Sequence, residues 1–200
     1  MPKAYRPWYI IGENNGQVPL KRQLLGLQTI EVKNLTLLDL GCAEGLTSIH
    51  MARQGARLVH GVELLDRAVE VGRSLVGFSE MSDRVKFFVG DLRQAKQALT
   101  QDGLLPSYDV ILAMASIQKL GKKSVPVLRH IASLCNRTLV IRLPKRELPN
   151  GFRTTTDPAK ILEQQGFKML WEGCGHPQGE PPYPMEGGSW LAKFDRVAAP

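Results

Sequence analysis

Short apolar runs alternate along this chain with longer segments in which apolar residues recur every three or four positions. The short runs predict strands over residues 36–41, 57–64, 85–91, 108–115, 137–143, 168–173 and 189–194. The longer segments predict helices, several with a glycine at or near the end, over residues 46–55, 65–77, 92–103, 123–135 and 155–166. This alternation is typical of an α/β domain in which helices cover both faces of a largely parallel sheet.

The two ends of the chain depart from this alternation. A long loop rich in glycine and proline joins the last two predicted strands, which leaves no room for a helix and predicts a hairpin at one edge of the sheet. Near the N-terminus, Trp8 and Tyr9 are expected either to pack on the sheet edge or to close a ligand site. We therefore expect one domain over residues 1–200, made of an N-terminal cap and helix (1–35), a core (36–153), and a C-terminal helix and hairpin (154–200).

The composition bears on the size of the core, the redox compartment and the solubility of the protein. Apolar residues make up 43% of the 200 residues, which is enough for a sizeable core. The three cysteines, Cys42, Cys135 and Cys174, are widely spaced, so neither a disulfide framework nor a zinc site is expected. Because no apolar run reaches the length of a membrane span or a signal-peptide core, we expect a soluble protein with no membrane partner. The cysteine pattern predicts a reducing, cytoplasmic setting and no metal ion.

Positive charge is concentrated in one window. Between Lys119 and Arg153 lie nine of the 26 basic residues but only one of the 19 acidic residues, Glu147, whereas the rest of the chain carries 17 basic and 18 acidic residues. Most of the nine end or follow the fourth and fifth predicted strands, which places them at the carboxyl edge of the sheet. Such a cluster favours an anionic partner, including a nucleic acid. The nine residues are Lys119, Lys122, Lys123, Arg129, Arg137, Arg142, Lys145, Arg146 and Arg153.

The stretch "LLDLGCAEG", residues 37–45, joins the first predicted strand to the first predicted helix. Gly41, Ala43 and Gly45 follow Asp39 in the pattern D-x-G-x-A-x-G. This pattern predicts a tight turn at which the backbone approaches a ligand and points free amide N–H groups at an anion. The spacing fits neither the nicotinamide fingerprint G-x-G-x-x-G nor a Walker loop, so a pyrophosphate ligand is disfavoured.

Acidic residues end the next two predicted strands. Glu63 lies 22 residues after Gly41, where a carboxylate can accept hydrogen bonds from both hydroxyls of a ribose. The third strand ends at Gly90-Asp91-Leu92. Asp91 could accept a hydrogen bond from an adenine amine, could cap the helix that follows, or could do both.

In order and spacing, these motifs resemble those of the class I S-adenosylmethionine-dependent methyltransferases. The resemblance covers residues 37–143, through "LLDLGCAEG", "GVEL", "VGDL" and "DVILAMASIQKL". It implies a Rossmann-like three-layer sandwich, a seven-stranded and mostly parallel sheet with an antiparallel edge hairpin, and S-adenosylmethionine as cofactor. By the same resemblance, the cofactor is bound by Asp39, Gly41, Cys42, Ala43, Gly45, Glu63, Leu64, Asp91, Leu92 and Met114.

The implied chemistry is transfer of a methyl group from a sulfonium to a nucleophilic N, O, S or C atom, with S-adenosylhomocysteine as the second product. Many relatives carry a histidine after the fourth strand, whereas this chain has "SIQKL" there. Ser116, Gln118 and Lys119 are therefore the candidates for acceptor contact, although a neutral amide is a poor base.

The histidines and one proline-rich stretch are explained without a catalytic role. His50 and His130 lie within predicted helices and are expected to be structural or surface residues, and His60 lies inside a predicted strand. His176 is expected to be a solvated loop residue. The stretch "GEPPYP", 179–184, resembles an element that grips target bases in nucleic-acid methyltransferases, but it follows the sixth strand instead of the fourth. We interpret residues 177–184 as a proline-rich specificity loop.

Three functions remain open from the sequence. The first is methyl transfer to an anionic acceptor that binds through the window Lys119–Arg153, and RNA or another nucleic acid is the favoured acceptor. The second is a small-molecule O- or N-methyltransferase. The third is a non-catalytic module that binds S-adenosylmethionine.

Overall fold

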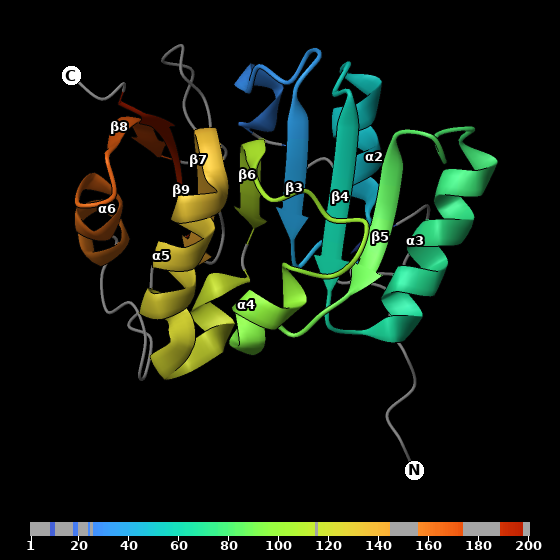
Figure 1. Cartoon of the computed structure of the whole chain (residues 1–200). Coiled ribbons are helices and arrows are strands. Elements are labelled where there is room, and N and C mark those ends of the chain that lie inside the picture. The colour runs from blue at the N-terminus through green and yellow to red at the C-terminus, as the bar shows by residue number, and fades with distance from the viewer. Residues whose placement is uncertain are drawn as a thin grey trace.

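A single seven-stranded sheet organises the molecule, with helices on both faces (Figure 1). The computed structural model describes residues 9–10, 18–19, 24, 26–114, 116–144, 156–173 and 189–197. In spatial order the strands are β5 (Val85–Val89), β4 (Leu58–Glu63), β3 (Thr36–Leu40), β6 (Tyr108–Met114), β7 (Cys135–Pro144), β9 (Ser189–Arg196) and β8 (Phe167–Gly173). These are the seven predicted strands, and the predicted fold class is confirmed.

Strand direction is parallel from β5 to β7, and only β9 runs against its neighbours. The predicted hairpin is therefore present at one edge, with β9 inserted between β7 and β8. The chain order also reverses between β3 and β6. In open α/β sheets, such a reversal at the carboxyl ends of the strands is where ligands bind.

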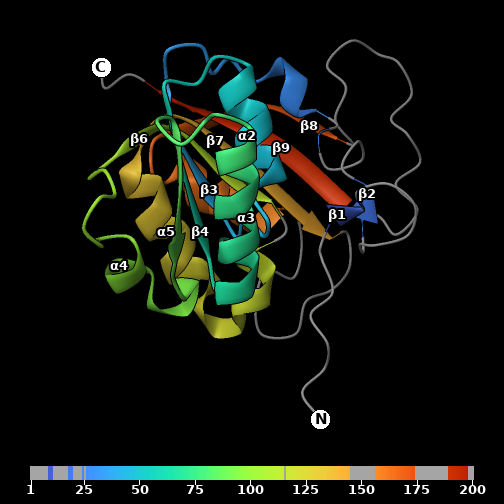
Figure 2. The same cartoon turned by 90° about the vertical axis from the view of Figure 1, so that its right-hand side faces the viewer.

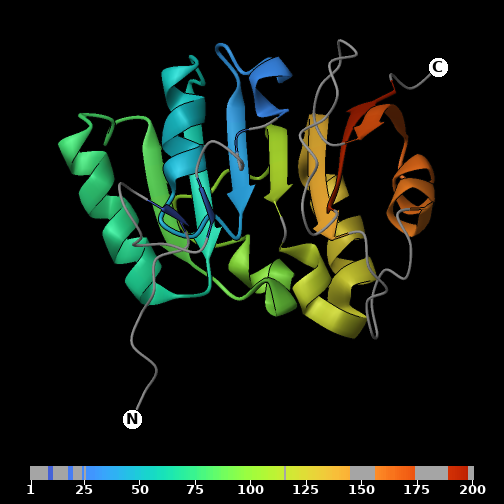
Figure 3. The same cartoon turned by 180° about the vertical axis from the view of Figure 1, so that it is seen from behind.

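Helices cover the sheet in two layers. On one face lie α2 (Leu46–Arg53) and α3 (Asp66–Phe78), and on the other lie α4 (Ala95–Ala98), α5 (Ser124–Leu134) and α6 (Thr156–Glu163), as Figures 1 and 3 show. Among the described helices, none combines the length and the apolar character needed to cross a membrane.

One helix is shorter than the sequence predicts. Residues 92–103 form the 3₁₀ turn η2 (Leu92–Gln94) and then the single turn α4, instead of one continuous helix. Two side chains bond back to the carbonyls of this turn: Thr100 Oγ1 donates to Lys96 O at 2.8 Å, and Gln101 Nε2 donates to Ala98 O at 2.8 Å. Such local bonds compete with the helical ladder and end it here.

The two faces of the sheet bury separate apolar clusters. Leu37 packs in the cluster beneath α2 and α3, whereas its neighbour Leu38 packs in the cluster with α5. Because successive residues of a strand point to opposite faces, a strand buried on both sides is apolar at every position. This explains why the strands were visible in the sequence as continuous apolar runs.

The N-terminal segment contributes β1 (Tyr9–Ile10) and β2 (Val18–Pro19), which form a separate two-stranded parallel sheet on the side of α2 and α3 (Figures 2 and 3). The 3₁₀ turn η1 (Leu27–Thr29) follows and buries Leu27 in the cluster beneath α2 and α3. Trp8 lies outside the described residues, and η1 is the described form of the C-terminal part of the helix predicted in the N-terminal segment.

Candidate active site

The loop after β3 has the tight geometry that its glycines predict. Gly41 and Gly45 both have φ +73°, and Ala43 between them has φ 50°, a region that favours glycine. Side chains are also excluded sterically, because a Cβ at position 41 would lie 2.7 Å from the Cβ of Ser116. A Cβ at position 45 would overlap the Phe87 ring. Both glycines are therefore required by space as well as by conformation.

The backbone amides of this loop differ from the sequence prediction. The Gly41 and Cys42 amides donate to the Val62 carbonyl at 2.8 and 3.3 Å, and the Gly45 amide donates to the Cys42 carbonyl at 2.9 Å. The Ala43 amide donates to Glu63 Oε2 at 3.1 Å. The prediction that these N–H groups are free for an anion is wrong, because the loop folds back on β4 and uses them internally.

Glu63 joins the loop to the end of β4. While Oε2 accepts the Ala43 amide, Oε1 accepts the amides of Leu64 and Leu65 at 2.8 and 3.0 Å. This network fixes the carboxylate at the carboxyl edge, where the sequence predicts a ribose ligand. Leu64 and Leu65 are about half exposed and place apolar surface beside it.

Asp39 is buried at the end of β3 and accepts a 2.7 Å hydrogen bond from Ser48 Oγ. Burial raises the pKa of Asp39 from 3.8 to about 6, against the opposing effect of the Ser48 bond, and the nearby Glu63 adds to the rise. Burial also raises the pKa of the Cys42 thiol well above its ordinary value. Asp39 thus joins the end of β3 to α2 through Ser48, on either side of the loop. Cys42 is a buried packing residue with an unreactive thiol.

Phe87 is a residue of this site that the sequence analysis missed. Three glycines from separate elements surround its ring: Gly45 in the loop, Gly61 in β4 and Gly72 in α3. A glycine inside a strand or a helix is unfavourable on its own, so Gly61 and Gly72 were the available signal. The ring of Phe87 forms the floor against which the loop packs.

Asp91 caps the segment after β5, as one of its predicted roles requires. Its Oδ1 accepts the Arg93 amide at 2.9 Å, and its Oδ2 pairs with the Arg93 guanidinium at 2.8 Å. The Arg93 hydrogen bond holds the pKa of Asp91 below its ordinary value. Leu92 beside it is buried. Adenine contact by Asp91 and Leu92 remains a prediction.

The three predicted acceptor residues after β6 lie in different environments. Ser116 is 9% exposed, and its Oγ is buried with no hydrogen-bond partner in the described part of the chain. Gln118 is half-buried, and Lys119 is exposed. They belong to the start of the 3₁₀ segment η3 (Ile117–Lys123), which Ser124 fixes by donating to the Ile117 carbonyl at 2.9 Å. The Ser116 side chain packs on the Gly41 loop, while its carbonyl accepts the Lys119 amide at 3.1 Å.

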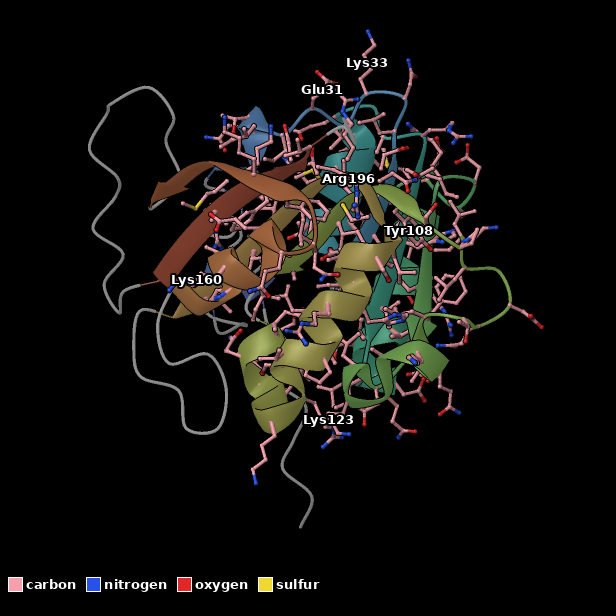
Figure 4. The ribbon with its side chains drawn as sticks, turned by 60° about the vertical axis from the view of Figure 1, so that its left-hand side comes forward. Glu31, Lys33, Tyr108, Lys123, Lys160 and Arg196 are labelled. Carbon is pink, nitrogen blue, oxygen red and sulfur yellow. The ribbon has the colours of Figure 1, made fainter. Side chains whose placement is uncertain are left out.

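The basic window divides into three groups in the structure. Lys119, Lys122 and Lys123 are exposed on η3, and Figure 4 shows Lys123 at the lower end of the molecule, opposite Glu31 and Lys33. Arg129 and Arg137 are exposed at other places, on α5 and near the start of β7. Arg142 differs from all of these, because it is only 3% exposed. The rest of the window, Lys145, Arg146 and Arg153, lies outside the described residues.

Arg142 lies at the carboxyl end of β7 in a cross-strand row with Met114 of β6 and Leu191 of β9. Met114 and Leu191 pack with the cluster beneath α2 and α3, so the row belongs to that face of the sheet. The family resemblance implies that Met114 borders the sulfonium, which remains a prediction. The row thus brings a buried guanidinium to the expected acceptor side of the cofactor.

The three described histidines differ in burial, with His50 and His130 half-buried and His60 buried. His60 is buried, its Nδ1 lies 2.8 Å from the hydroxyl of Tyr108, and burial lowers its pKa to about 4. Burial also lowers the pKa values of His50 and His130. His176 and the loop 177–184 lie outside the described residues. No three His, Cys, Asp or Glu side chains in the described ranges gather as metal ligands.

The arrangement fits the predicted cofactor at three points. The tight loop at Gly41 and Gly45 lets the backbone approach a ligand, and Glu63 fixes a carboxylate at the same edge. Ser116 adds a buried hydroxyl that has no partner among the described residues, which is an open hydrogen-bonding position at the loop. These residues would hold an adenosyl amino acid along the carboxyl ends of β3, β4 and β6.

Comparison with curated proteins gives two related enzymes. The O-antigen chain terminator bifunctional methyltransferase/kinase WbdD of Escherichia coli is 27% identical over 143 residues, which are 68% of this chain. The magnesium-protoporphyrin O-methyltransferase of Rhodobacter capsulatus is 26% identical over 102 residues, which are 51% of this chain. The matches span only 19% and 41% of the length of these relatives.

Comparison with solved structures gives the same fold. The magnesium protoporphyrin IX methyltransferase ChlM of Synechocystis with bound S-adenosylmethionine superposes with a TM-score of 0.65 at 21% identity, covering 84% of this chain and 72% of that one. The family model described as "Methyltransferase domain" matches residues 31–176. The match includes the loop, Glu63, Asp91 and the whole of β7. The chain therefore belongs to the methyltransferase-domain family, within the class I S-adenosylmethionine-dependent methyltransferases.

Proposed function

We propose that this protein is an S-adenosylmethionine-dependent methyltransferase whose acceptor is a small molecule carrying a carboxylate or phosphate group. The observation that carries the proposal is Arg142, a buried guanidinium beside Met114 at the carboxyl edge of the sheet. Arginine is rarely buried, and its planar fork matches the oxygens of a carboxylate or phosphate.

The cofactor side of the reaction follows from the loop and Glu63. When bound, S-adenosylmethionine supplies an electrophilic methyl group on its sulfonium. Glu63 binds the ribose hydroxyls, and the exposed Leu64 offers apolar surface for the adenine. The loop would hold the methionine part of S-adenosylmethionine, while Glu63 and Leu64 would hold its adenosine part. Fixing both parts aligns the methyl group with an incoming nucleophile, which is the main contribution a protein makes to this chemistry.

The residues after β6 favour an acceptor that needs no base. Residues 115–123 contain no histidine or acid, and Gln118 is a neutral amide. A carboxylate or phosphate oxygen is already ionised at neutral pH and can attack without losing a proton. O-methylation of an anionic oxygen is therefore the reaction that fits both Arg142 and "SIQKL".

A nucleic-acid acceptor is the second candidate. Its specific support is the exposed group Lys119, Lys122 and Lys123, since surface cations on a sheet edge suit a phosphate backbone. We rank it second because a guanidinium as deep as Arg142 suits one enclosed anionic group better than a polymer surface. The relatives also act on other acceptors by name, magnesium-protoporphyrin in one case and an O-antigen chain in the other.

Transfer of labelled methyl from S-adenosylmethionine into a cell extract tests the proposal. We expect label in small molecules that nuclease does not alter, and its release as methanol in mild alkali would identify a carboxyl methyl ester. Label in large species that nuclease degrades would establish the nucleic-acid alternative. Cofactor binding without any transfer would favour the non-catalytic module.

Two arginine variants localise the acceptor site. Arg142→Met should raise the acceptor KM by about ten-fold or more, because a charge-assisted bond is lost. Arg129→Met removes the same charge from the exposed surface of α5 and should leave KM unchanged. Affinity for S-adenosylhomocysteine reports that each variant is folded. Equal KM values for the two variants would contradict the role of Arg142.

A further inference from the structure

The hydroxyl of Ser116 stands apart from the other polar groups near the loop. Ser116 follows β6 at the carboxyl edge, is more than nine-tenths buried, and has no hydrogen-bond partner for Oγ within the described ranges. Leaving a buried hydroxyl unbonded is costly, so such a group indicates a partner that binds from outside the chain.

The position of Ser116 identifies what that partner touches. Its side chain packs directly on the backbone of Gly41, where an added Cβ would come within 2.7 Å of the Ser116 Cβ and 3.5 Å of its Oγ. Gly41 opens the loop that would run beneath the methionine part of the cofactor. The hydroxyl thus lies against the loop on the cofactor side of the site, whereas the Lys119 side chain is exposed.

The loop amides of residues 41–43 and 45 cannot donate hydrogen bonds to a bound carboxylate, so another donor is required. The amides of Gly41, Cys42, Ala43 and Gly45 are bonded within the protein and do not offer donors to a carboxylate. An amino-acid ligand lying on the loop still brings a carboxylate that requires donors. Ser116 Oγ has no partner among the described residues, and Ser116 follows β6, which flanks β3 on the side opposite to β4 and its residues Val62 and Glu63.

We infer that Ser116 is a cofactor-binding residue that donates a hydrogen bond to the carboxylate of the methionine part of S-adenosylmethionine. This inference rests on the proposed use of that cofactor and gives Ser116 a different role from the acceptor contact that the sequence predicts. Ser116 thereby positions the donor by its amino-acid end, while Glu63 holds the opposite, ribose end.

Two ligands separate this role from a general effect on the site. S-adenosylhomocysteine contains the amino-acid part, whereas 5′-methylthioadenosine retains the adenosine and sulfur but lacks it. In calorimetric titrations, Ser116→Ala should weaken S-adenosylhomocysteine binding by roughly ten-fold, because a bond to a charged group is lost. Binding of 5′-methylthioadenosine should stay the same. No change in either affinity, or equal weakening of both, would overturn the inference.

Ser124→Ala is the matched control. Ser124 is a buried serine eight positions further along the chain, and its hydroxyl has a partner, the Ile117 carbonyl at 2.9 Å. This variant should lower the thermal midpoint and leave the ratio of the two affinities unchanged. Ser116→Ala should leave the midpoint of the ligand-free protein unchanged or higher, because it removes an unbonded polar group. If the unaltered protein binds no S-adenosylhomocysteine, this result contradicts the proposed function and therefore also the role of Ser116. If the unaltered protein binds it and only the Ser116→Ala result differs from the expectation, the role of Ser116 alone is contradicted.

Discussion

Single polar side chains around the loop after β3 are held in states that folding alone does not favour. Asp39 is a carboxyl group with one hydrogen bond from Ser48 in an apolar setting, and Ser116 is a hydroxyl with no bond in the described chain. Both lie at the carboxyl edge. Residues that cost stability in the free protein are expected where a ligand later supplies the missing interactions.

The first prediction concerns the pH dependence of stability. Burial raises the pKa of Asp39 from 3.8 to about 6, so the folded protein binds this proton more tightly than the unfolded chain does. Its contribution to stability is therefore full below about pH 4 and is lost as the pH rises through about 6. The difference is on the order of 3 kcal/mol. Asp39→Asn should remove this loss and be more stable than the parent at neutral pH.

Urea unfolding between about pH 4 and pH 7.5 measures the effect of Asp39. Ser48→Ala is the companion variant. It removes the hydrogen bond that lowers the Asp39 pKa, so the loss of stability should extend to a higher pH and become larger. Parallel stability curves for Asp39→Asn and the parent would contradict the raised pKa.

A second prediction at this scale concerns Glu63. Because Glu63 accepts the amides of Ala43, Leu64 and Leu65, Glu63→Ala should weaken S-adenosylhomocysteine binding by about ten-fold or more and also lower the free energy of unfolding by roughly 1–3 kcal/mol. Glu63→Gln keeps one acceptor oxygen and should lose less of both. Unchanged affinity in Glu63→Ala would refute the predicted ribose contact.

At the scale of elements, close packing around one aromatic ring fixes the loop relative to β4 and α3. The ring of Phe87 in β5 fills the space left by the missing side chains of Gly45, Gly61 and Gly72. The loop, β4 and α3 therefore meet at a single side chain of β5. The position of the loop thus depends on β5 and α3 as well as on β3.

Two glycine variants test this packing. A Cβ on Gly61 would lie 2.5 Å from Phe87 Cδ1 and 2.7 Å from Cys42 Sγ, so Gly61→Ala should lower the free energy of unfolding by about 1–3 kcal/mol. Gly77 in α3 has no atom within 4 Å of the same position. Gly77→Ala should therefore stabilise the helix, by up to about 1 kcal/mol. Chemical denaturation measures both changes, and a neutral Gly61→Ala would show that Phe87 moves freely.

Other elements are joined through Arg196 at the end of β9. Its guanidinium donates to the carbonyl of Cys135 at 2.8 Å and to that of Ala132 in α5 at 2.7 Å, and it stacks over the ring of Phe167 at 4.4 Å. A cation at the carboxyl end of α5 is also favoured by the helix dipole. Arg196, labelled in Figure 4, therefore links α5 to the two edge strands.

At the scale of the whole molecule, charge is divided between a buried arginine and an exposed lysine group at the same edge. If Arg142 carries acceptor recognition, methyl transfer to the small acceptor should change little between low and physiological salt. A nucleic-acid acceptor would bind far more weakly over the same range, because counterion release drives its association. Replacing Lys119, Lys122 and Lys123 together by serine should then reduce transfer only in the nucleic-acid case.

The sequence predicted all seven strands and the family. Central parallel strands such as β3 are buried on both faces and therefore form nearly continuous apolar runs, and the loop motif is local. It did not distinguish Arg142 from the surface cations, since burial depends on which strands become neighbours. The sequence also did not predict that the loop amides form hydrogen bonds within the protein. Those bonds depend on how β4 packs beside β3, which the spacing of residues does not encode.

The insertion of β9 between β7 and β8 has a consequence for how the protein is made. During synthesis, β7 and β8 are complete before residues 189–196 exist, yet they cannot pair correctly until that strand arrives between them. Until then the apolar edge of β7 lacks its native neighbour and is open to wrong partners, including a premature contact with β8. The nascent chain thus passes through a stage in which the cofactor half of the sheet can be formed while the acceptor edge at Arg142 is still unfinished.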